Sequence, residues 1–294
     1  MKNSISVMIL TVLLFNSVNV LISLNPCKAD SNIIYVDDDG DGNYTNIQNA
    51  IEYASIGDTV FVYNGTYYEN IVINKAIVLE GEDKNTTFIN GSLTGDIIHI
   101  IANGVNISGF TIEYSGNVFP DAGINISSDY NTISGNIMIN NFYGMTMFSA
   151  NKNIISDNFV SNNDHCGIYM SGSSNNKIYG NIIKYHQYNG IGMYDSTDNN
   201  MIFGNTMSNN DFCGINIRQS SNNNITQNNL VDNNIGIHNP GDRYSNQLKD
   251  NNYSNNNIDV ENDLGFTFIT SIAIVFVVVM IIFFVLFSKR KKQP

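Results

Sequence analysis

The chain has 294 residues, and its 26 acidic residues against 14 basic ones give a net charge of −12 at pH 7. All of the acidic residues lie between positions 30 and 264, where only 8 basic residues accompany them, so this part has a net charge of −18. Such an acidic surface repels phosphate backbones, which excludes nucleic acid as a partner, and a polyanionic sugar would need a bridging cation.

Residues 1–29 have the pattern of a signal peptide. Lys2 precedes an apolar run over residues 7–24, and the small residue Ala29 ends a segment suited to a signal peptidase. We therefore expect residues 1–29 to be removed and the rest of the chain to be exported.

Residues 30–58 are expected to form an N-terminal cap. Thr45 is a suitable N-cap residue for an amphipathic helix over residues 46–54, in which apolar residues recur at helical spacing.

A polar segment before this helix has part of a calcium-binding pattern. Asp37, Asp39 and Asp41, followed by Gly42, fit the first half of a calcium loop. Gln48 stands where that loop needs a bidentate Glu, so a polar turn leading into the helix is the alternative interpretation.

Residues 59–260 repeat with a period of about 23 residues, because a glycine register and an asparagine register keep step along the chain. A fixed period of this length is typical of solenoid or array proteins. The glycines are Gly144, Gly167, Gly190, Gly214 and Gly236, and the asparagines are Asn136, Asn158, Asn181, Asn205, Asn228 and Asn251.

The repeats predict an all-β fold, a right-handed parallel β-helix solenoid. Their apolar runs of about three to five residues are too short for helices and are separated by turn-forming residues. Equivalent residues of successive coils then stack in columns, and the cap helix covers the open end of the core. We expect Met145, Ile168, Ile191, Ile215, Ile237, Met147, Met170, Met193 and Ile217 to point inward, and Thr146, Tyr169, Gly192, Asn216 and His238 to point outward.

Both registers are interpreted as structural. Stacked carboxamides can bond to one another and to turn backbones, and Asn tolerates the left-handed conformation that sharp corners require. The asparagine register is therefore expected to form a ladder, and the glycine register to mark another corner.

Residues 266–287 predict a single transmembrane helix. They form an uncharged stretch of 22 residues, followed by a basic tail over residues 288–294, which would stay in the cytoplasm. Residues 261–265 would be a juxtamembrane link. The body of the protein is then expected to lie outside the cell membrane.

The corner before the glycine register holds candidate copper ligands in His165, Cys166 and His186, since imidazole and thiolate suit this metal. Adjacent residues on a strand point to opposite faces, so His165 and Cys166 converge only if the corner is irregular. Cys213 is equivalent to Cys166 two repeats away, about 9–10 Å if coils stack at strand spacing, so free thiols are expected.

Asp164 and Asp211 are candidate catalytic carboxylates in the same corner. Two coils would separate them by about 9–10 Å, at the upper edge of the range for inverting glycoside hydrolysis. Asp is also common in turns, which is the alternative interpretation.

Tyr169, Tyr188 and Tyr194 are candidate ligand-binding residues. Aromatic rings on an outer face can pack against sugar rings, although a structural role accounts for them equally well.

The segments "GNYTNIQNAI" and "GDTVFVYNGTYYENIVINKAIVLEGED", together with the two registers, resemble the NosD-type β-helix domain over residues 33–258. This domain belongs to a wider group of carbohydrate-binding and sugar-hydrolysing β-helices. The resemblance implies the fold and a copper-related role in an exported system. The membrane tail departs from the soluble periplasmic protein that gives the domain its name.

Three functions therefore remain open. They are a non-catalytic protein that binds carbohydrate or another extended polymer at the cell surface, a copper-binding or copper-site maturation protein, and a polysaccharide hydrolase or lyase.

Overall fold

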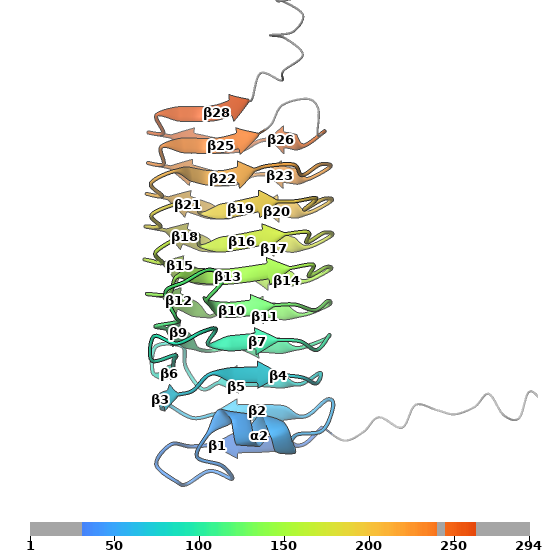
Figure 1. Ribbon diagram of the computed structural model, residues 1–294, viewed down its shortest axis with the longest axis vertical. Coiled ribbons are helices and arrows are strands. Elements are labelled where there is room, and N and C mark those ends of the chain that lie inside the picture. The colour runs from blue at the N-terminus through green and yellow to red at the C-terminus, as the bar shows by residue number, and fades with distance from the viewer. Residues whose placement is uncertain (1–30, 240–244, 263–294) are drawn as a thin grey trace, which may run out of the picture. The chain divides into compact units, whose positions relative to one another are not determined.

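The computed structural model describes residues 31–239 and 245–262. They form a right-handed parallel β-solenoid of about ten coils, in agreement with the predicted fold (Figure 1). The predicted signal peptide and membrane span lie outside the described residues. Among the residues that are described, no helix is long and apolar enough to cross a membrane.

Three parallel sheets run the length of the solenoid. Sheet A contains β1 (Ile33–Val36), β2 (Thr59–Val62), β5 (Val78–Gly81), β8 (Asn106–Ser108), β11 (Thr132–Ser134), β14 (Ile154–Ser156), β17 (Lys177–Tyr179), β20 (Met201–Phe203), β23 (Asn224–Thr226) and β26 (Gln247–Lys249). Sheet B contains β3 (Gly65–Tyr68), β6 (Thr87–Asn90), β9 (Thr111–Glu113), β12 (Ile137–Ile139), β15 (Phe159–Ser161), β18 (Ile182–Lys184), β21 (Thr206–Ser208), β24 (Asn229–Val231) and β27 (Asn252–Ser254). Sheet C contains β4 (Ile71–Ile73), β7 (Ile98–Ile100), β10 (Ala122–Ile126), β13 (Tyr143–Phe148), β16 (Ile168–Ser171), β19 (Ile191–Tyr194), β22 (Cys213–Ile217), β25 (Ile235–Asn239) and β28 (Ile258–Asn262).

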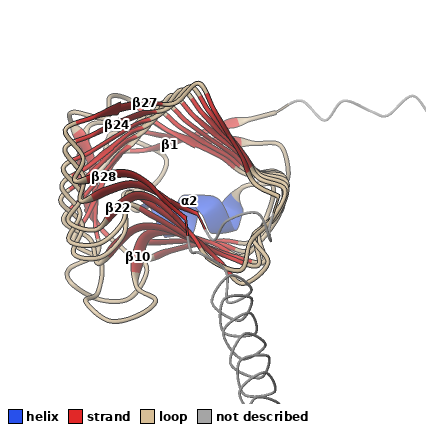
Figure 2. Cartoon of the chain, turned by 90° about the horizontal axis from the view of Figure 1, so that it is seen from above, coloured by secondary structure: helices blue, strands red, loops and turns tan. Residues whose placement is uncertain are grey.

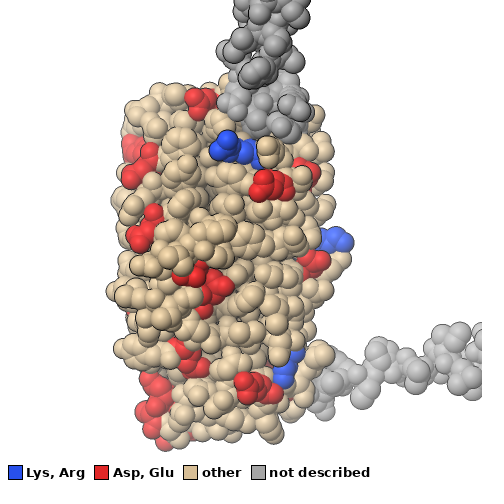
Figure 3. Space-filling view, viewed as in Figure 1, with Lys and Arg blue, Asp and Glu red and all other residues tan. Residues whose placement is uncertain are grey.

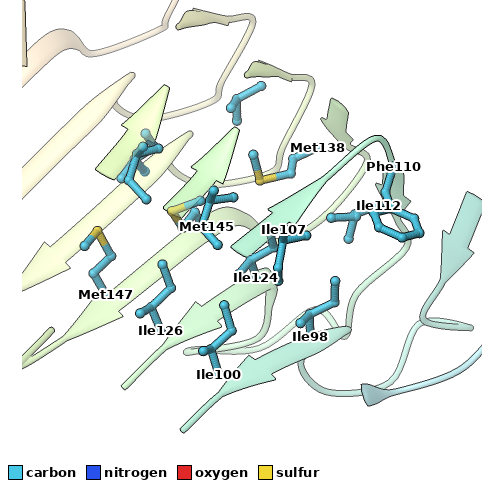
Figure 4. Close-up of a cluster of buried hydrophobic side chains, with 14 of the residues drawn as sticks. Ile98, Ile100, Ile107, Phe110, Ile112, Ile124, Ile126, Met138, Met145 and Met147 are labelled. Atoms are coloured by element: carbon cyan, nitrogen blue, oxygen red, sulfur yellow. The ribbon is translucent and has the colours of Figure 1, made fainter. Parts of the chain in front are cut away.

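The core is a stack of apolar layers between the three sheets. Met145 pairs with Ile168, which pairs with Ile191, so equivalent residues lie over one another as predicted. All nine residues expected to point inward are fully buried. Figure 4 shows part of this packing, with Ile and Met side chains of neighbouring coils in contact range of each other.

The expected helix covers the N-terminal end of the core (Figure 2). It is α2 (Ile47–Tyr53), and it buries Ile47, Ala50 and Ile51. Its N-cap residue is Asn46, which accepts a hydrogen bond from the Asn49 N–H, so the assignment of Thr45 to this role was wrong. The solenoid also begins earlier than residue 59, because β1 already pairs with β2.

Three asparagine ladders stabilise the three corners of the solenoid. In each one, a backbone N–H donates to the side-chain oxygen of the equivalent residue in the next coil, at 2.7–3.3 Å, and most side-chain amides donate to a carbonyl in the preceding coil. The first ladder, between sheets A and B, is the predicted one. The second, between sheets C and A, contains Asn131, Asn153, Asn176, Asn200, Asn223 and Asn246, and the third, between sheets B and C, contains Asn141, Asn163, His186, Asn210, Asn233 and Asn256.

The conformational reason given for the asparagine register was wrong. The left-handed residue at this corner is the one before each ladder asparagine, for example Asp157 with φ 56° and Gly204 with φ 63°. Asparagine occupies the ladder positions because its side chain forms hydrogen bonds with buried backbone groups. Leaving those groups without partners would cost free energy.

The glycine register is explained by crowding inside a corner. A Cβ added to Gly190 would lie 2.6 Å from the carbonyl oxygen of Gly214, and one added to Gly214 would lie 2.6 Å from a methyl group of Leu230. Each register glycine therefore allows the coils and the core side chains of sheet B to approach closely.

Candidate functional site

The outer face of sheet C and the corner before it carry a continuous group of aromatic rings. The corner column contains Phe142, His165, Tyr188 and Phe212, whose successive ring centroids are 5.8, 4.7 and 5.2 Å apart. The sheet column contains Phe148, Tyr169 and Tyr194, with centroids 5.8 and 5.0 Å apart. Both columns follow the axis of the solenoid because each ring comes from the next coil.

The members of the corner column stand two places before a register glycine, in corners of two different lengths. Two residues separate Asn141 from Gly144, whereas three separate Asn163 from Gly167. The additional residue bends the chain, and this irregular corner brings Nδ1 of His165 to 3.2 Å from Sγ of Cys166. His165 and Cys166 were expected to converge only if this corner is irregular, and the corner is irregular.

A surface loop adds a ring that the sequence reasoning did not identify. Seven residues separate Ser115 from Gly123, at the place where later coils have two or three. Phe119 in this loop contacts Tyr143, Phe148 and Tyr169 edge to face, with centroids 6.1–6.2 Å apart. Its side chain remains 59% exposed. The extra length of this coil is the signal that could have pointed to it.

The three predicted tyrosines lie on this face, but they are not equivalent. Tyr188 is 41% exposed, whereas Tyr169 and Tyr194 are partly buried and stack on each other. The Tyr194 hydroxyl accepts a hydrogen bond from the Asn189 amide at 3.0 Å. Tyr188 and Phe119 therefore offer the free ring surface, and Phe119 packs against Tyr169 of the stacked pair.

Several polar atoms under the rings lack hydrogen-bond partners. Asn125 Oδ1, Thr146 Oγ1 and Asn189 Oδ1 are buried on the outer side of sheet C and pair with none of the described residues. Two of these three atoms are carbonyl oxygens, which can only accept. The face is therefore short of hydrogen-bond donors.

The two candidate catalytic carboxylates lie at the corner beside the corner column. Asp164 accepts a hydrogen bond from the Gln187 amide at 3.3 Å, and Gln187 stands one coil from each of them. Asp164 and Asp211 are both exposed on the surface. Their positions in the corner match the predicted column, and nothing around them excludes water.

A third carboxylate at this corner is already satisfied by the protein. Asp96 accepts from the Asn125 amide at 2.7 Å and from the Ala122 N–H at 3.0 Å. Burial raises the pKa of Asp96 above its ordinary value, and these hydrogen bonds partly oppose the shift.

The copper ligand set does not come together. His186 is a rung of the third ladder, where its Nδ1 accepts from the Asn163 N–H, so its ring points into the corner and away from the outer face. Burial raises the pKa of Cys166 to about 12, although metal binding requires the thiolate. No group of three His, Cys, Asp or Glu side chains that could hold a metal is found within residues 31–239 and 245–262.

The acidic segment before α2 forms a turn that bonds to itself. The Asp41 N–H donates to Asp39 at 3.4 Å, the Asp39 N–H donates to Asp37 at 3.5 Å, and Asp38 accepts from the Thr66 N–H at 3.1 Å. These contacts support the alternative interpretation, a polar turn. Gln48, at the twelfth position of the calcium pattern, accepts instead from the N–H of Val72.

Comparison with protein families gives one match over most of the chain. Residues 47–265 match the family described as periplasmic copper-binding protein (NosD). No curated protein matches the chain.

Solved structures with the same fold act on sugars. The catalytic domain of a GH87 α-1,3-glucanase in complex with nigerose is 16% identical, with a TM-score of 0.58, and the match covers 71% of this chain and 43% of that one. The periplasmic alginate epimerase AlgG is 17% identical, with a TM-score of 0.53, and the match covers 67% and 51%. The chain thus spans about half the length of these structures, and identities this low show the fold alone.

Proposed function

The chain belongs to the NosD family, and from this starting point we propose that it binds extended glycans outside the cytoplasm, without catalysis, along the outer face of sheet C. The observation that carries this proposal is the pair of aromatic columns running parallel to the axis. Aromatic rings supply large apolar contact areas for sugar rings at little cost in conformational entropy.

The spacing of the columns suits a linear polymer. Successive coils are about 4.8 Å apart, which is close to the length of one sugar residue in an extended β-1,4-linked chain. A glycan lying along the axis would therefore meet equivalent positions at nearly every residue. The glycan chemistry of the two structures with the same fold is consistent with this use of the solenoid.

Two observations favour binding over chemistry. Asp164 and Asp211 stand exposed on an outer corner, whereas glycoside hydrolysis relies on a carboxyl group kept in a protected environment. The described residues also contain no group of three His, Cys, Asp or Glu side chains that could hold a metal, so no role of copper is included in the proposal.

The proposed place of action rests on the two ends of the chain. Residues 1–29 have the pattern of a signal peptide, and residues 266–287 are long and apolar enough to span a membrane. We expect protease added to intact cells to digest the body while a tag placed after Pro294 stays protected. Protection of the body as well would contradict the proposed location.

The binding function is tested with the purified full-length chain and soluble glycan oligomers. Phe119→Ala and Tyr188→Ala should each weaken binding roughly threefold to tenfold, because an aromatic contact contributes about 0.5–1.5 kcal/mol. The matched control is Tyr68→Ala, which removes a ring that is 70% exposed on sheet B. Equal losses in all three variants, or no binding by the unaltered chain, would contradict the proposal.

A further inference from the structure

The carboxylates beside the corner column have no cationic partner. Asp164 and Asp211 immediately precede His165 and Phe212 of that column, and both are exposed. Asp164 accepts a hydrogen bond from the neutral amide of Gln187, and neither carboxylate forms an ion pair with any described residue. Their negative charge is therefore open to solvent at the edge of the aromatic rings.

The other edge of the rings is acidic as well. Asp195 follows the sheet column directly and accepts a hydrogen bond from the Ser171 hydroxyl at 3.1 Å. The pKa of Tyr169 is raised mainly by burial and secondly by the charge of Asp195, which places this carboxylate within electrostatic reach of the rings. The aromatic face thus has negative charge on both sides.

Basic side chains offset this charge at the Asp195 edge but not at the corner of Asp164 and Asp211. Lys184 lies over the rings of Phe159 and Tyr185, 5.0 and 5.2 Å from their centroids, and belongs to sheet B. Arg218 follows Ile217, which pairs with Met193 in the neighbouring coil, so this basic residue lies beside Tyr194, at the edge of the rings where Asp195 lies and at the opposite end of the strand from the corner of Asp164 and Asp211. Figure 3 shows acidic side chains along the left edge of this face, where sheet B leads into sheet C, further acidic side chains at its centre and right, and one basic side chain on its upper part.

Aromatic rings and carboxylates together favour positively charged ligands. A ring face attracts a cation through its quadrupole, and a nearby carboxylate adds a charge-assisted hydrogen bond. A uronate chain would instead bring further negative charge to this face.

We propose that the glycan recognised on the outer face of sheet C carries free amino groups, and that Asp164 and Asp211 pair with its ammonium groups. This inference rests on the proposed glycan-binding function and narrows it to a substrate class. Two coils, about 9–10 Å, separate the two carboxylates, so they would meet amino groups two sugar residues apart.

The test compares three β-1,4-linked hexamers at pH 6 with the full-length chain in the presence of a chelator. They are the glucosamine hexamer, its fully N-acetylated counterpart with the same backbone, and a glucuronate hexamer. At low salt the glucosamine hexamer should bind at least tenfold more tightly than the acetylated one, and the difference should shrink in 0.5 M NaCl, because exposed charges are screened. The glucuronate hexamer should bind most weakly.

The site is assigned with the double variant Asp164→Asn, Asp211→Asn. It should lose at least fivefold of the preference for the glucosamine hexamer while its affinity for the acetylated hexamer stays within twofold. The matched control is Asp157→Asn, which removes an exposed carboxylate at the corner between sheets A and B.

Three results would overturn the inference and leave the glycan-binding function standing. Equal binding of the glucosamine and acetylated hexamers at low salt would show that the protein does not recognise the charge of the amino groups. Glucuronate binding as tight as glucosamine binding would do the same, and an unchanged preference in the double variant would remove the two aspartates from the site. Binding of none of the three hexamers would overturn the glycan-binding function itself, and the inference with it.

Discussion

The backbone N–H of Asn163 donates a hydrogen bond to Nδ1 of His186 over 3.2 Å, at the one rung of the third ladder where an imidazole replaces a carboxamide. The ring is fully buried, and its Nε2 has no hydrogen-bond partner that meets ordinary distance and angle limits. Burial is the main cause that lowers the pKa of His186 to about 4. This rung is therefore a weak point when the protein is acidified.

Stability should fall between about pH 6.5 and pH 4. In this range the imidazole of His186 binds a proton in the unfolded chain but not in the folded one, so the free energy of unfolding decreases as the pH falls. At pH 5 the loss relative to pH 7 should be about 2 kcal/mol from this group. Urea denaturation at a series of pH values measures it.

His186→Asn isolates this contribution from that of the carboxylates. The variant restores the side chain found at the other rungs, so its stability at pH 7 should stay within about 1 kcal/mol of the original, and at pH 5 it should be the more stable protein. Parallel pH profiles of the two proteins would show that His186 does not cause the acid sensitivity.

A central rung of the first ladder should contribute more to the free energy of unfolding than the last rung does. The Asn181 side chain accepts from the N–H of Asn158 and donates to the carbonyls of Ile155 and Tyr179, and it is buried. Asn181→Ala should lower the free energy of unfolding by about 2–4 kcal/mol, because several buried groups lose their partners. Asn251→Ala, at the partly buried last rung, is the matched control and should cost less than half as much. Equal losses of stability in the two variants would show that the buried hydrogen bonds of the ladder do not cause the effect.

Gly190→Ala should be strongly destabilising. The added methyl group would lie 2.6 Å from the Gly214 carbonyl oxygen and 3.1 Å from the Asn210 amide, so the coils must move apart, at a cost of about 3 kcal/mol. Thermal unfolding of the purified variant measures this.

Gly204 provides the comparison, because glycine is favoured there by the backbone conformation and not by close packing. It has φ 63° and open space around it. Gly204→Ala should cost about 1 kcal/mol, and Gly204→Asn less, since Asn adopts this conformation more readily. If Gly190→Ala proved as mild as Gly204→Ala, close packing of the coils would not explain the register.

Cys166 and Cys213 should resist thiol reagents in the folded protein. Both are free and fully buried, and burial raises the pKa of each thiol to about 12. In a Cys27→Ser background, a colorimetric thiol assay at pH 8 should detect fewer than about 0.2 thiols per chain without denaturant and two with it. Rapid labelling of Cys166 in the folded chain would show that its aromatic cover opens.

The repeat made the fold predictable, whereas the ladders were only partly so. A period of 23 residues with alternating apolar positions places Met145 and Ile168 in one inward column without any knowledge of the corners. The second and third ladders have the same period, but asparagine is so frequent here that their members do not stand out. His186 was interpreted as a metal ligand because its place in the third ladder depends on which residue precedes sheet C.

The candidate site was predictable where it follows the repeat and unpredictable where it departs from it. Tyr169 and Tyr194 share a face because Tyr169 pairs with Gly192, and residues two apart on a strand point to the same side. Phe119 lies in a loop without counterpart in later coils, so no period indicates where its ring would pack. The contact between His165 and Cys166 needs the bend at an irregular corner, and alternation along a strand argues against it.

Each rung of the ladders bonds within its own coil and to the coils directly above and below it. Duplication of a central stretch of about 23 residues would therefore add one winding and leave the existing ones intact. Evolution can thus change the length of the solenoid in increments of about 4.8 Å, one coil at a time.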